Sequence, residues 1–219
     1  MRRTKRQSGV DVVNPGLRVR KQQFVRNSIF DAAIELFAVK GFDETTVEEV
    51  AQAAGVSRAS FFRYFSSKDD LLAQNVLKYG HALTTAIKAS QASLPPFEVM
   101  KETVLSVARH TVDHPHLRQV IEISMRSPSA MQAHNSRMLE VEGSVAVAFA
   151  ERIGSSSTDE LEPRLLATLT LSAMNVAIFS WYRGDSQDLA AAVDQVFSNL
   201  ARIIGERTNL IPRKRSRHV

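Results

Sequence analysis

The sequence predicts an all-α protein with an N-terminal three-helix helix-turn-helix domain and a larger, helical C-terminal domain. Apolar residues recur at helical spacing along most of the 219 residues, no alternating strand pattern occurs, and residues 45–65 contain two short helices around a glycine turn. This length is enough for two unequal domains, each with its own core. We expect a basic flexible arm at 1–20, the helix-turn-helix domain at 21–67, the second helical domain at 68–206 and a basic tail at 207–219.

The first helix is expected from about Lys21 to Val39, ending before Gly41. Its apolar stripe should pack over the two short helices and consists of Val25, Ile29, Ala32, Ala33, Leu36 and Phe37. The three helices together would form one small domain.

The next short helix begins with a capping box, in which Thr46 and Glu49 each bind the backbone N–H of the other. Gly55 follows the last apolar residue, where a left-handed backbone turns the chain at no steric cost for glycine. Ser57 is then the expected N-cap of a second short helix that ends near Tyr64. An ordinary helical hairpin would show the same caps, so these signals alone do not define a function.

The second short helix has the composition expected of a DNA-recognition helix. Phe61 and Phe65 should face inward, and no Asp or Glu occurs from Ala51 to Ser67, where DNA phosphates would repel a carboxylate. Its N-terminal and outer side would present Arg58, Ala59, Ser60, Phe62 and Arg63 to base edges and phosphates.

Residues 40–72, from Lys-Gly-Phe-Asp-Glu-Thr-Thr-Val through Phe-Phe-Arg-Tyr-Phe to Asp-Asp-Leu-Leu, resemble the DNA-binding domain of the tetracycline-repressor (TetR) family, and the match covers roughly residues 22–75. The resemblance implies that Thr46 caps its helix beside the DNA backbone and that Arg58 and Ser60 approach bases or phosphates. The DNA-binding positions it implies are Thr46, Arg58, Ala59, Ser60, Phe62, Arg63, Tyr64 and Lys68.

Specific roles follow from the same resemblance. Phe62 and Tyr64 occupy aromatic backbone-contact positions, and Lys68 meets a phosphate. Many family members have glycine at the position of Ala59 and tyrosine at that of Phe62. The resemblance therefore does not extend to the close backbone approach that glycine allows or to the hydrogen bond from the tyrosine hydroxyl to a phosphate. Phe62 can still touch a sugar or a thymine methyl group.

The rest of the chain predicts further helices separated by proline, glycine and serine. Ser67 can cap the first of them. Their expected ranges are about Lys68–Ser90, Pro96–Val112, Ile121–Met125, Ser129–Ile153, Asp159–Tyr182 and Ser186–Gly205.

In the family the second domain is all-helical, and its final two helices usually pair with those of a second subunit. The resemblance therefore implies a homodimer that binds a pseudo-palindromic, double-stranded DNA operator, with half-sites ~34 Å or a multiple of it apart. The small residues of the last two helices would allow close packing, although simple intramolecular packing would use them equally. They include Ala167, Ala173, Ala177, Ala190, Ala191 and Ala192.

A ligand-responsive regulator also needs a cavity in its second domain, because an effector acts only by binding one arrangement more tightly. Residues that could line it are Met100, Met125, Arg126, Met131, Met138, Phe149, Met174, Phe179 and Trp181. The alternative is a well-packed core, which methionine and aromatic residues at helical spacing usually build.

The Phe-Phe-Arg-Tyr-Phe signature and the segment from Pro115 to Arg137 are similar to a branch of the family that includes the mycofactocin-system regulators. That similarity implies an acyl-coenzyme A thioester as effector, with Arg118, Arg126 and Arg137 meeting its anionic groups. A planar drug-like ligand, or no ligand at all, are the alternatives.

Composition narrows the cellular setting. The chain has a net charge of +5 and no cysteine, so disulfides and cysteine-based zinc sites are excluded. No apolar run approaches the ~18 residues of a membrane span. We expect a cytoplasmic, nucleoid-associated bacterial protein without membrane contact. The basic N-terminal arm could enter the minor groove, or it could be a solvated tail like the basic C-terminus.

No catalytic, metal or cofactor site is expected. The best constellation is His110 and His114 with Asp113 or His116 as a third ligand, but Pro115 should end the helix and turn the third ligand away. No glycine-rich phosphate loop and no nucleophile elbow occur. The leading function is a ligand-responsive transcriptional regulator, most often a repressor in this family; the alternative is an architectural DNA-binding protein that has no effector.

Overall fold

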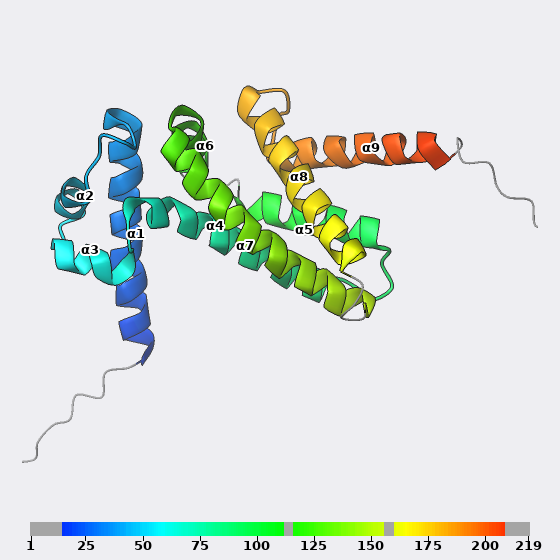
Figure 1. Ribbon diagram of the computed structural model, residues 1–219, viewed down its shortest axis with the longest axis horizontal. Coiled ribbons are helices and arrows are strands. Elements are labelled where there is room, and N and C mark those ends of the chain that lie inside the picture. Colours follow the sequence, from blue (N-terminus) through cyan, green and yellow to red (C-terminus); the bar gives the residue numbers. More distant parts are fainter. Residues whose placement is uncertain (1–14, 112–115, 156–159, 209–219) are drawn as a thin grey trace, which may run out of the picture. The chain divides into compact units, whose positions relative to one another are not determined.

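The computed structural model describes residues 15–111, 116–155 and 160–208, and within these ranges the regular structure is entirely helical (Figure 1). The chain divides into two compact units, Met1–Lys68 and Asp69–Val219. In chain order the helices are α1 Pro15–Lys40, α2 Val47–Ala53, α3 Arg58–Tyr64, α4 Lys68–Ala89, α5 Pro96–Thr111, α6 Leu117–Arg126, α7 Pro128–Ile153, α8 Leu161–Arg183 and α9 Leu189–Thr208. The predicted all-α class is confirmed.

Helix α1 begins six residues earlier than the sequence predicts, at Pro15 and not at about Lys21. Proline is favoured at the start of a helix, because its fixed φ suits the helix and its missing N–H has no intrahelical acceptor there. The last part of the expected flexible arm is therefore helical, and residues 1–14 of that arm lie outside the described residues. The buried face of α1 contains Ile29, Phe30, Ala33, Ile34 and Phe37.

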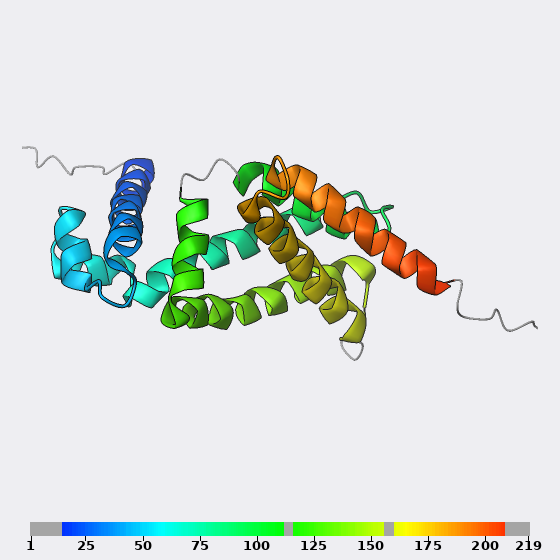
Figure 2. The ribbon, with the colours of Figure 1, turned by 90° about the horizontal axis from the view of Figure 1, so that it is seen from above.

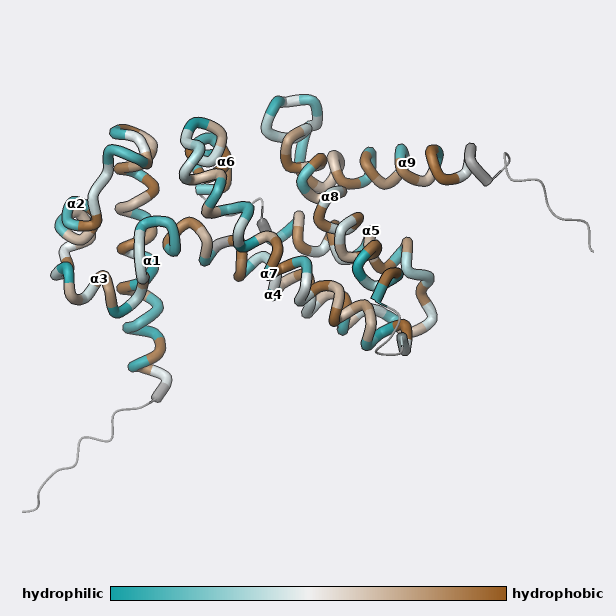
Figure 3. The backbone as a smooth tube through the Cα atoms, in the orientation of Figure 1, coloured by the Kyte–Doolittle hydropathy of each residue, from teal (hydrophilic) through white to brown (hydrophobic). Residues whose placement is uncertain are grey.

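The second unit is a helical bundle in which α8 packs against α7 and α9, and α5 packs against α8 and α9 (Figure 2). Its apolar side chains meet in one core, as the brown segments of α5, α7, α8 and α9 in Figure 3 illustrate. The largest fully buried side chains of this core are Phe149, Phe197, Leu83, Ile87, Met174 and Leu189. Helix α7 ends at Gly154, whose φ of 65° stops the helix as glycine allows.

Helix α8 is the one described helix whose length and apolar composition would suffice to cross a membrane. In the structure it is a packed element of the second unit, with Leu166, Ala167, Leu171, Met174 and Ala177 buried in the core. Core helices of globular proteins can have the same composition.

Helices α4 and α7 approach each other closely at Gly80. A Cβ atom at this position would lie 2.7 Å from a methyl group of Val141, closer than real Cβ atoms come to other atoms. Val141 is itself buried, so it has little room to move aside. Glycine at position 80 therefore allows this helix crossing.

We predict that Gly80→Ala lowers the free energy of unfolding by about 1–3 kcal/mol, because it overpacks this crossing. Gly143→Ala on α7 is the matched control: no atom lies within 4 Å of its Cβ position, so it should stabilise the helix by about 0.5–1 kcal/mol. Chemical denaturation of both variants measures the difference. Equal stability of the two variants would contradict the close crossing.

Candidate functional site

The predicted capping box at the start of α2 is present. The Thr46 hydroxyl accepts the backbone N–H of Glu49 at 3.3 Å, and the Glu49 carboxylate accepts the Thr46 N–H at 2.9 Å. Lys40, at the end of α1, donates to the other carboxylate oxygen at 2.6 Å. The ammonium of Lys40, followed by the Thr46 hydrogen bonds, lowers the pKa of Glu49 from its ordinary 4.5 to about 2.

The turn between α2 and α3 also follows the sequence pattern. Gly55 has a φ of 67°, in the left-handed region, and the N–H of Val56 returns to the carbonyl of Ala51 at 2.9 Å. Ser57 caps α3, its hydroxyl accepting the N–H of Ser60 at 3.1 Å. These local bonds fix where α3 begins and which of its faces turns outward.

Helix α3 buries one aromatic face and exposes the other. Phe61 is fully buried and Phe65 nearly so, and their ring centroids lie 5.7 Å apart. Arg58, Phe62 and Arg63 are exposed, with 45% of Phe62 accessible. This inward and outward division is the one the sequence predicts.

The exposed side chains of α3 support one another. The Nε of Arg58 lies 2.7 Å from the Glu48 carboxylate, and its guanidinium carbon lies 5.3 Å from the Phe62 ring centroid. The guanidinium carbon of Arg63 lies 5.2 Å from the ring of Tyr64. Both partners of the Arg58–Glu48 pair are largely exposed, so the pair is weak.

The other predicted DNA-binding positions, apart from Lys68, lie on α3 and at the N-cap of α2. Ala59 is exposed on α3, whereas Ser60 and Tyr64 are half-buried, Ser60 beside the Ser57 cap. Thr46 is exposed at the start of α2. Thr46 is the N-cap of α2, the other three positions lie on α3, and the two helices pack against each other. Their contacts with bases and phosphates stay predictions.

Lys68 has protein acceptors that the sequence did not suggest. Its ammonium donates to the carbonyl oxygens of Phe42 at 2.7 Å, Asp43 at 2.9 Å and Thr45 at 3.2 Å, and lies 4.8 Å from the Phe42 ring centroid. An ammonium has three protons, so these bonds occupy all of them. A phosphate contact by Lys68 stays a prediction, and it would have to share or replace one of these bonds.

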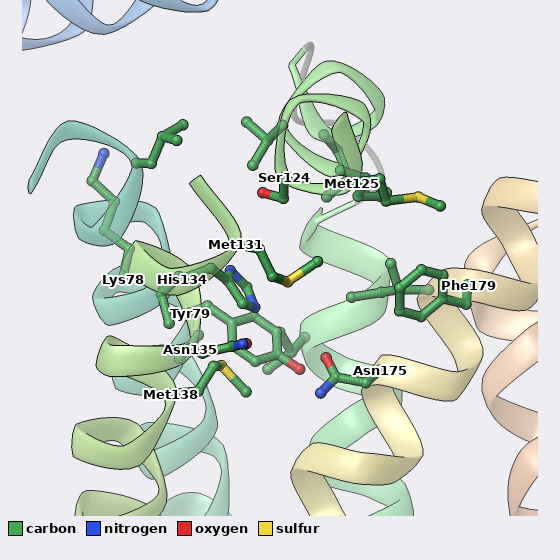
Figure 4. Close-up of a pocket in the computed structure, with 18 of the residues that line it drawn as sticks. Lys78, Tyr79, Ser124, Met125, Met131, His134, Asn135, Met138, Asn175 and Phe179 are labelled. Carbon is green, nitrogen blue, oxygen red and sulfur yellow. The ribbon is translucent and has the colours of Figure 1, made fainter. Parts of the chain in front are cut away.

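The second unit contains a cavity of about 450 Å³ between α4, α5, α6, α7 and α8 (Figure 4). Its volume lies in the range of pockets that hold small molecules. The lining is mainly apolar and includes Leu72, Val76, Tyr79, Val107, Leu117, Ile121, Met125, Met131, His134, Asn135, Met138, Asn175, Ile178 and Phe179.

The predicted pocket residues divide into two groups. Met125 and Phe179 line the cavity, and so do Met131 and Met138. The others are absent from the lining of this cavity: Met100, Phe149, Met174 and Trp181 are buried in the core, and their place in an effector pocket stays a prediction. Arg126 is exposed and forms an ion pair at 2.5 Å with Glu122, one turn earlier on α6.

Sequence reasoning missed the polar residues of the lining, above all Tyr79, His134 and Asn175. A signal for Tyr79 was available, since Leu72, Val76 and Tyr79 follow one another at i, i+4 and i+7 and therefore share one face of α4. No comparable pattern marks His134 or Asn175, because whether a helix face meets a core or a cavity depends on its neighbours.

The histidine cluster has local partners within the described residues. His110 Nδ1 lies 2.7 Å from the carbonyl oxygen of Ser106, and His116 Nδ1 lies 2.7 Å from Gln119 Oε1. Asp113 and His114 lie outside the described residues. Among the residues that the structure does describe, no group of three acidic or histidine side chains is arranged to hold a metal ion.

The first unit contains a capped helix-turn-helix whose recognition helix has no carboxylate, and the second, helical unit contains a cavity. Together these two features define the class of one-component transcriptional regulators. Comparison with known families gives the particular family. Residues 29–74 match the bacterial regulatory proteins of the tetR family, and residues 94–205 match the MftR C-terminal domain. The chain belongs to the TetR family, in the branch whose second domain is of the MftR type.

Two curated relatives are transcriptional regulators. The chain is 28% identical to TcmR of Streptomyces glaucescens, over 81% of each chain. It is also 28% identical to the protein of Mycobacterium tuberculosis named MftR for the regulation of mycofactocin biosynthesis, over 81% of this chain and 90% of that protein. The relatives thus support a regulator and not an enzyme.

Solved structures share the fold. The fatty acid degradation regulator FadR of Bacillus halodurans aligns with a TM-score of 0.57 and 19% identity, over 80% of this chain and 93% of that one. FadR of Bacillus subtilis, solved in complex with stearoyl-CoA, aligns with a TM-score of 0.56 and 20% identity, over 78% of this chain and 95% of that one.

The depressed pKa of Glu49 predicts a pH dependence. Because the folded pKa of about 2 lies below the ordinary 4.5, the stabilisation from this carboxylate is complete above about pH 4.5 and is lost as the pH falls toward 2. Glu49→Gln should remove this part of the acid sensitivity, seen as a smaller decrease of the melting temperature over that range. Glu44→Gln, at an exposed carboxylate of the same unit, should decline like the wild type. An unchanged acid profile in Glu49→Gln would contradict the assignment.

Proposed function

We propose that the protein is a homodimeric repressor that binds a two-fold symmetric DNA operator through α3 and is released when a small molecule occupies the cavity of the second unit. The observation that carries the proposal is the presence, in one chain, of an outward-facing recognition helix without carboxylates and a ligand-sized cavity. Helix α4 connects the two features, because it begins at Lys68 and supplies Leu72, Val76 and Tyr79 to the cavity lining.

Exposed apolar side chains support the dimer. Leu161, Leu165 and Val176 of α8 are 79%, 56% and 57% exposed, and their spacing places them along one stripe of the helix. Ile203 and Ile204 of α9 are about half exposed. Apolar side chains exposed along one stripe mark interaction surfaces more often than singly scattered ones do. A second copy of α8 and α9 is the occupant that the family resemblance implies.

The class of effector includes acyl-coenzyme A thioesters. One solved neighbour, FadR of Bacillus subtilis, is described in complex with stearoyl-CoA, and the lining of the present cavity is largely apolar. However, Arg118, Arg126 and Arg137, which the sequence suggested for anionic groups, are not among the lining residues. A compact apolar ligand is therefore to be tested alongside acyl-coenzyme A.

The proposal is tested by selecting bound fragments from the source genome with purified protein at one fixed salt concentration. The selection is repeated with a panel of compounds that includes long-chain acyl-coenzyme A. A regulator should prefer a palindromic site by ~10³-fold or more over unrelated DNA, and one panel member should release it. Uniform binding to all fragments would overturn the proposal and favour an architectural DNA-binding protein.

We predict that Arg58→Ala lowers affinity for the selected operator by about 1–3 kcal/mol and reduces the preference for it over unrelated DNA, because Arg58 reads bases. Arg109→Ala, at an exposed arginine of the second unit, removes the same charge and should leave both quantities unchanged. Fluorescence anisotropy with operator and shuffled DNA gives the two dissociation constants. A uniform loss on both DNAs would make Arg58 a phosphate contact only.

We predict that Leu165→Glu converts the dimer to a monomer at micromolar concentration, because it places a charge in the apolar stripe of α8. Leu139→Glu is the matched control, since Leu139 is 73% exposed on α7, outside the proposed interface. Sedimentation velocity gives the molecular mass of each variant. A Leu165→Glu variant that stays dimeric would exclude this stripe from the interface.

A further inference from the structure

The cavity of the second unit contains a buried hydroxyl group that has no hydrogen-bond partner. The Tyr79 hydroxyl oxygen is inaccessible to solvent, and no acceptor or donor among the described residues reaches it. Buried polar side chains in native proteins nearly always have a partner, and a missing one destabilises the free protein. Tyr79 is therefore a candidate for a group whose partner is a ligand.

The neighbours of Tyr79 fit this interpretation. Figure 4 shows its ring among Met131, Met138 and His134, with the hydroxyl directed to the same side of the cavity as the Asn175 amide. Methionine side chains are flexible and adapt to what they contact. Small rearrangements of Met131 and Met138 can therefore open the hydroxyl to a molecule in the cavity.

The lining also argues against a buried anion. It contains no arginine, and its Lys78 and His110 side chains belong to exposed residues. Burial raises the pKa of Tyr79 and lowers the pKa of His134, so that both stay uncharged at neutral pH. An unpaired carboxylate transferred into such surroundings would lose its hydration without gaining a counter-ion.

The three cations suggested by sequence for anionic groups make other contacts. Arg126 pairs with Glu122, and Arg137 lies 2.9 Å from Glu140. The guanidinium carbon of Arg118 lies 4.2 Å from the Trp181 ring centroid. None of the three lines the cavity, so an anion that they recognised would lie outside it.

We infer that the cavity takes an uncharged, largely apolar molecule with a carbonyl oxygen, and that the Tyr79 hydroxyl donates a hydrogen bond to this oxygen. The carbonyl can belong to a free ketone or ester, or to an acyl thioester whose polar part stays outside. The apolar body of the ligand packs against Met131, Met138 and Phe179. The inference concerns ligand binding alone, and only the effect of that binding on regulation rests on the proposed function.

The test measures binding of three compounds of similar shape to the full-length protein without DNA, by isothermal titration calorimetry. 2-Acetylnaphthalene carries a neutral carbonyl, 2-ethylnaphthalene carries none, and 2-naphthoate carries a carboxylate. The ketone should bind most tightly and the carboxylate most weakly. Palmitoyl-coenzyme A is a fourth compound, which presents the carbonyl as a thioester.

Tyr79→Phe isolates the hydroxyl, because it keeps the ring. It should weaken ketone binding by about 3- to 10-fold, as expected for one neutral hydrogen bond, and leave binding of 2-ethylnaphthalene unchanged. It should also raise the melting temperature of the free protein, since an unpaired buried hydroxyl is removed. Tyr182→Phe is the matched control: Tyr182 is not in the lining, and its loss should change neither affinity.

Each outcome decides the inference. Weaker binding in Tyr79→Phe for the ketone supports a free carbonyl ligand, and the same loss for palmitoyl-coenzyme A alone supports a thioester. Equal or tighter binding of 2-naphthoate, no binding of any carbonyl compound, or the same affinities in Tyr79→Phe would overturn the inference. Operator selection tests the proposed function separately. A protein that binds the ketone but no specific DNA would contradict the proposed function and leave this inference intact.

Discussion

The proposed link between the recognition helix and the cavity depends on the hydrogen bonds that the Lys68 ammonium group donates. It donates to three carbonyl oxygens of the segment between α1 and α2, at Phe42, Asp43 and Thr45. Hydrogen bonds from a charged donor are stronger than neutral ones, and all of the ammonium protons are used. Since Lys68 is the first residue of α4, the start of that helix is fixed to the segment that leads into the capping box of α2.

The same helix borders the cavity further along. Leu72, Val76 and Tyr79 line the cavity, and at Gly80 the helix comes close to Val141 of α7. In the proposed mechanism a ligand that favours one position of α4 also favours one position of the α1–α2 segment, because Lys68 joins them. Such coupling requires only that the ligand bind one arrangement more tightly than the other.

Local signals in the sequence predicted the local structure well. The capping box of Thr46, the left-handed Gly55 and the Ser57 cap each depend on residues within a few positions of one another, so the sequence contains the whole interaction. The inward Phe61 and Phe65 follow from helical periodicity for the same reason. Resemblance to the family added the functional meaning of these elements, which the caps alone did not provide.

Contacts between distant parts of the chain were not predictable in this way. The carbonyl partners of Lys68 lie 23 to 26 residues away, and nothing local distinguishes this lysine from a phosphate ligand. Likewise, Met174 and Met131 both occur at helical spacing, but only the packing of neighbouring helices places the first in the core and the second at the cavity. The start of α1 was missed because basic residues near a terminus suggested a flexible arm.

The most direct test of the central claim is the coupling between effector and operator in a Lys68→Gln variant. The quantity measured is the ratio of operator dissociation constants with and without a saturating amount of the compound that releases the wild-type protein. If Lys68 links α4 to the DNA-binding unit, the variant should bind that compound normally in the absence of DNA but show a ratio much closer to one. A ratio equal to that of the wild type, whatever the operator affinity itself, would contradict the account.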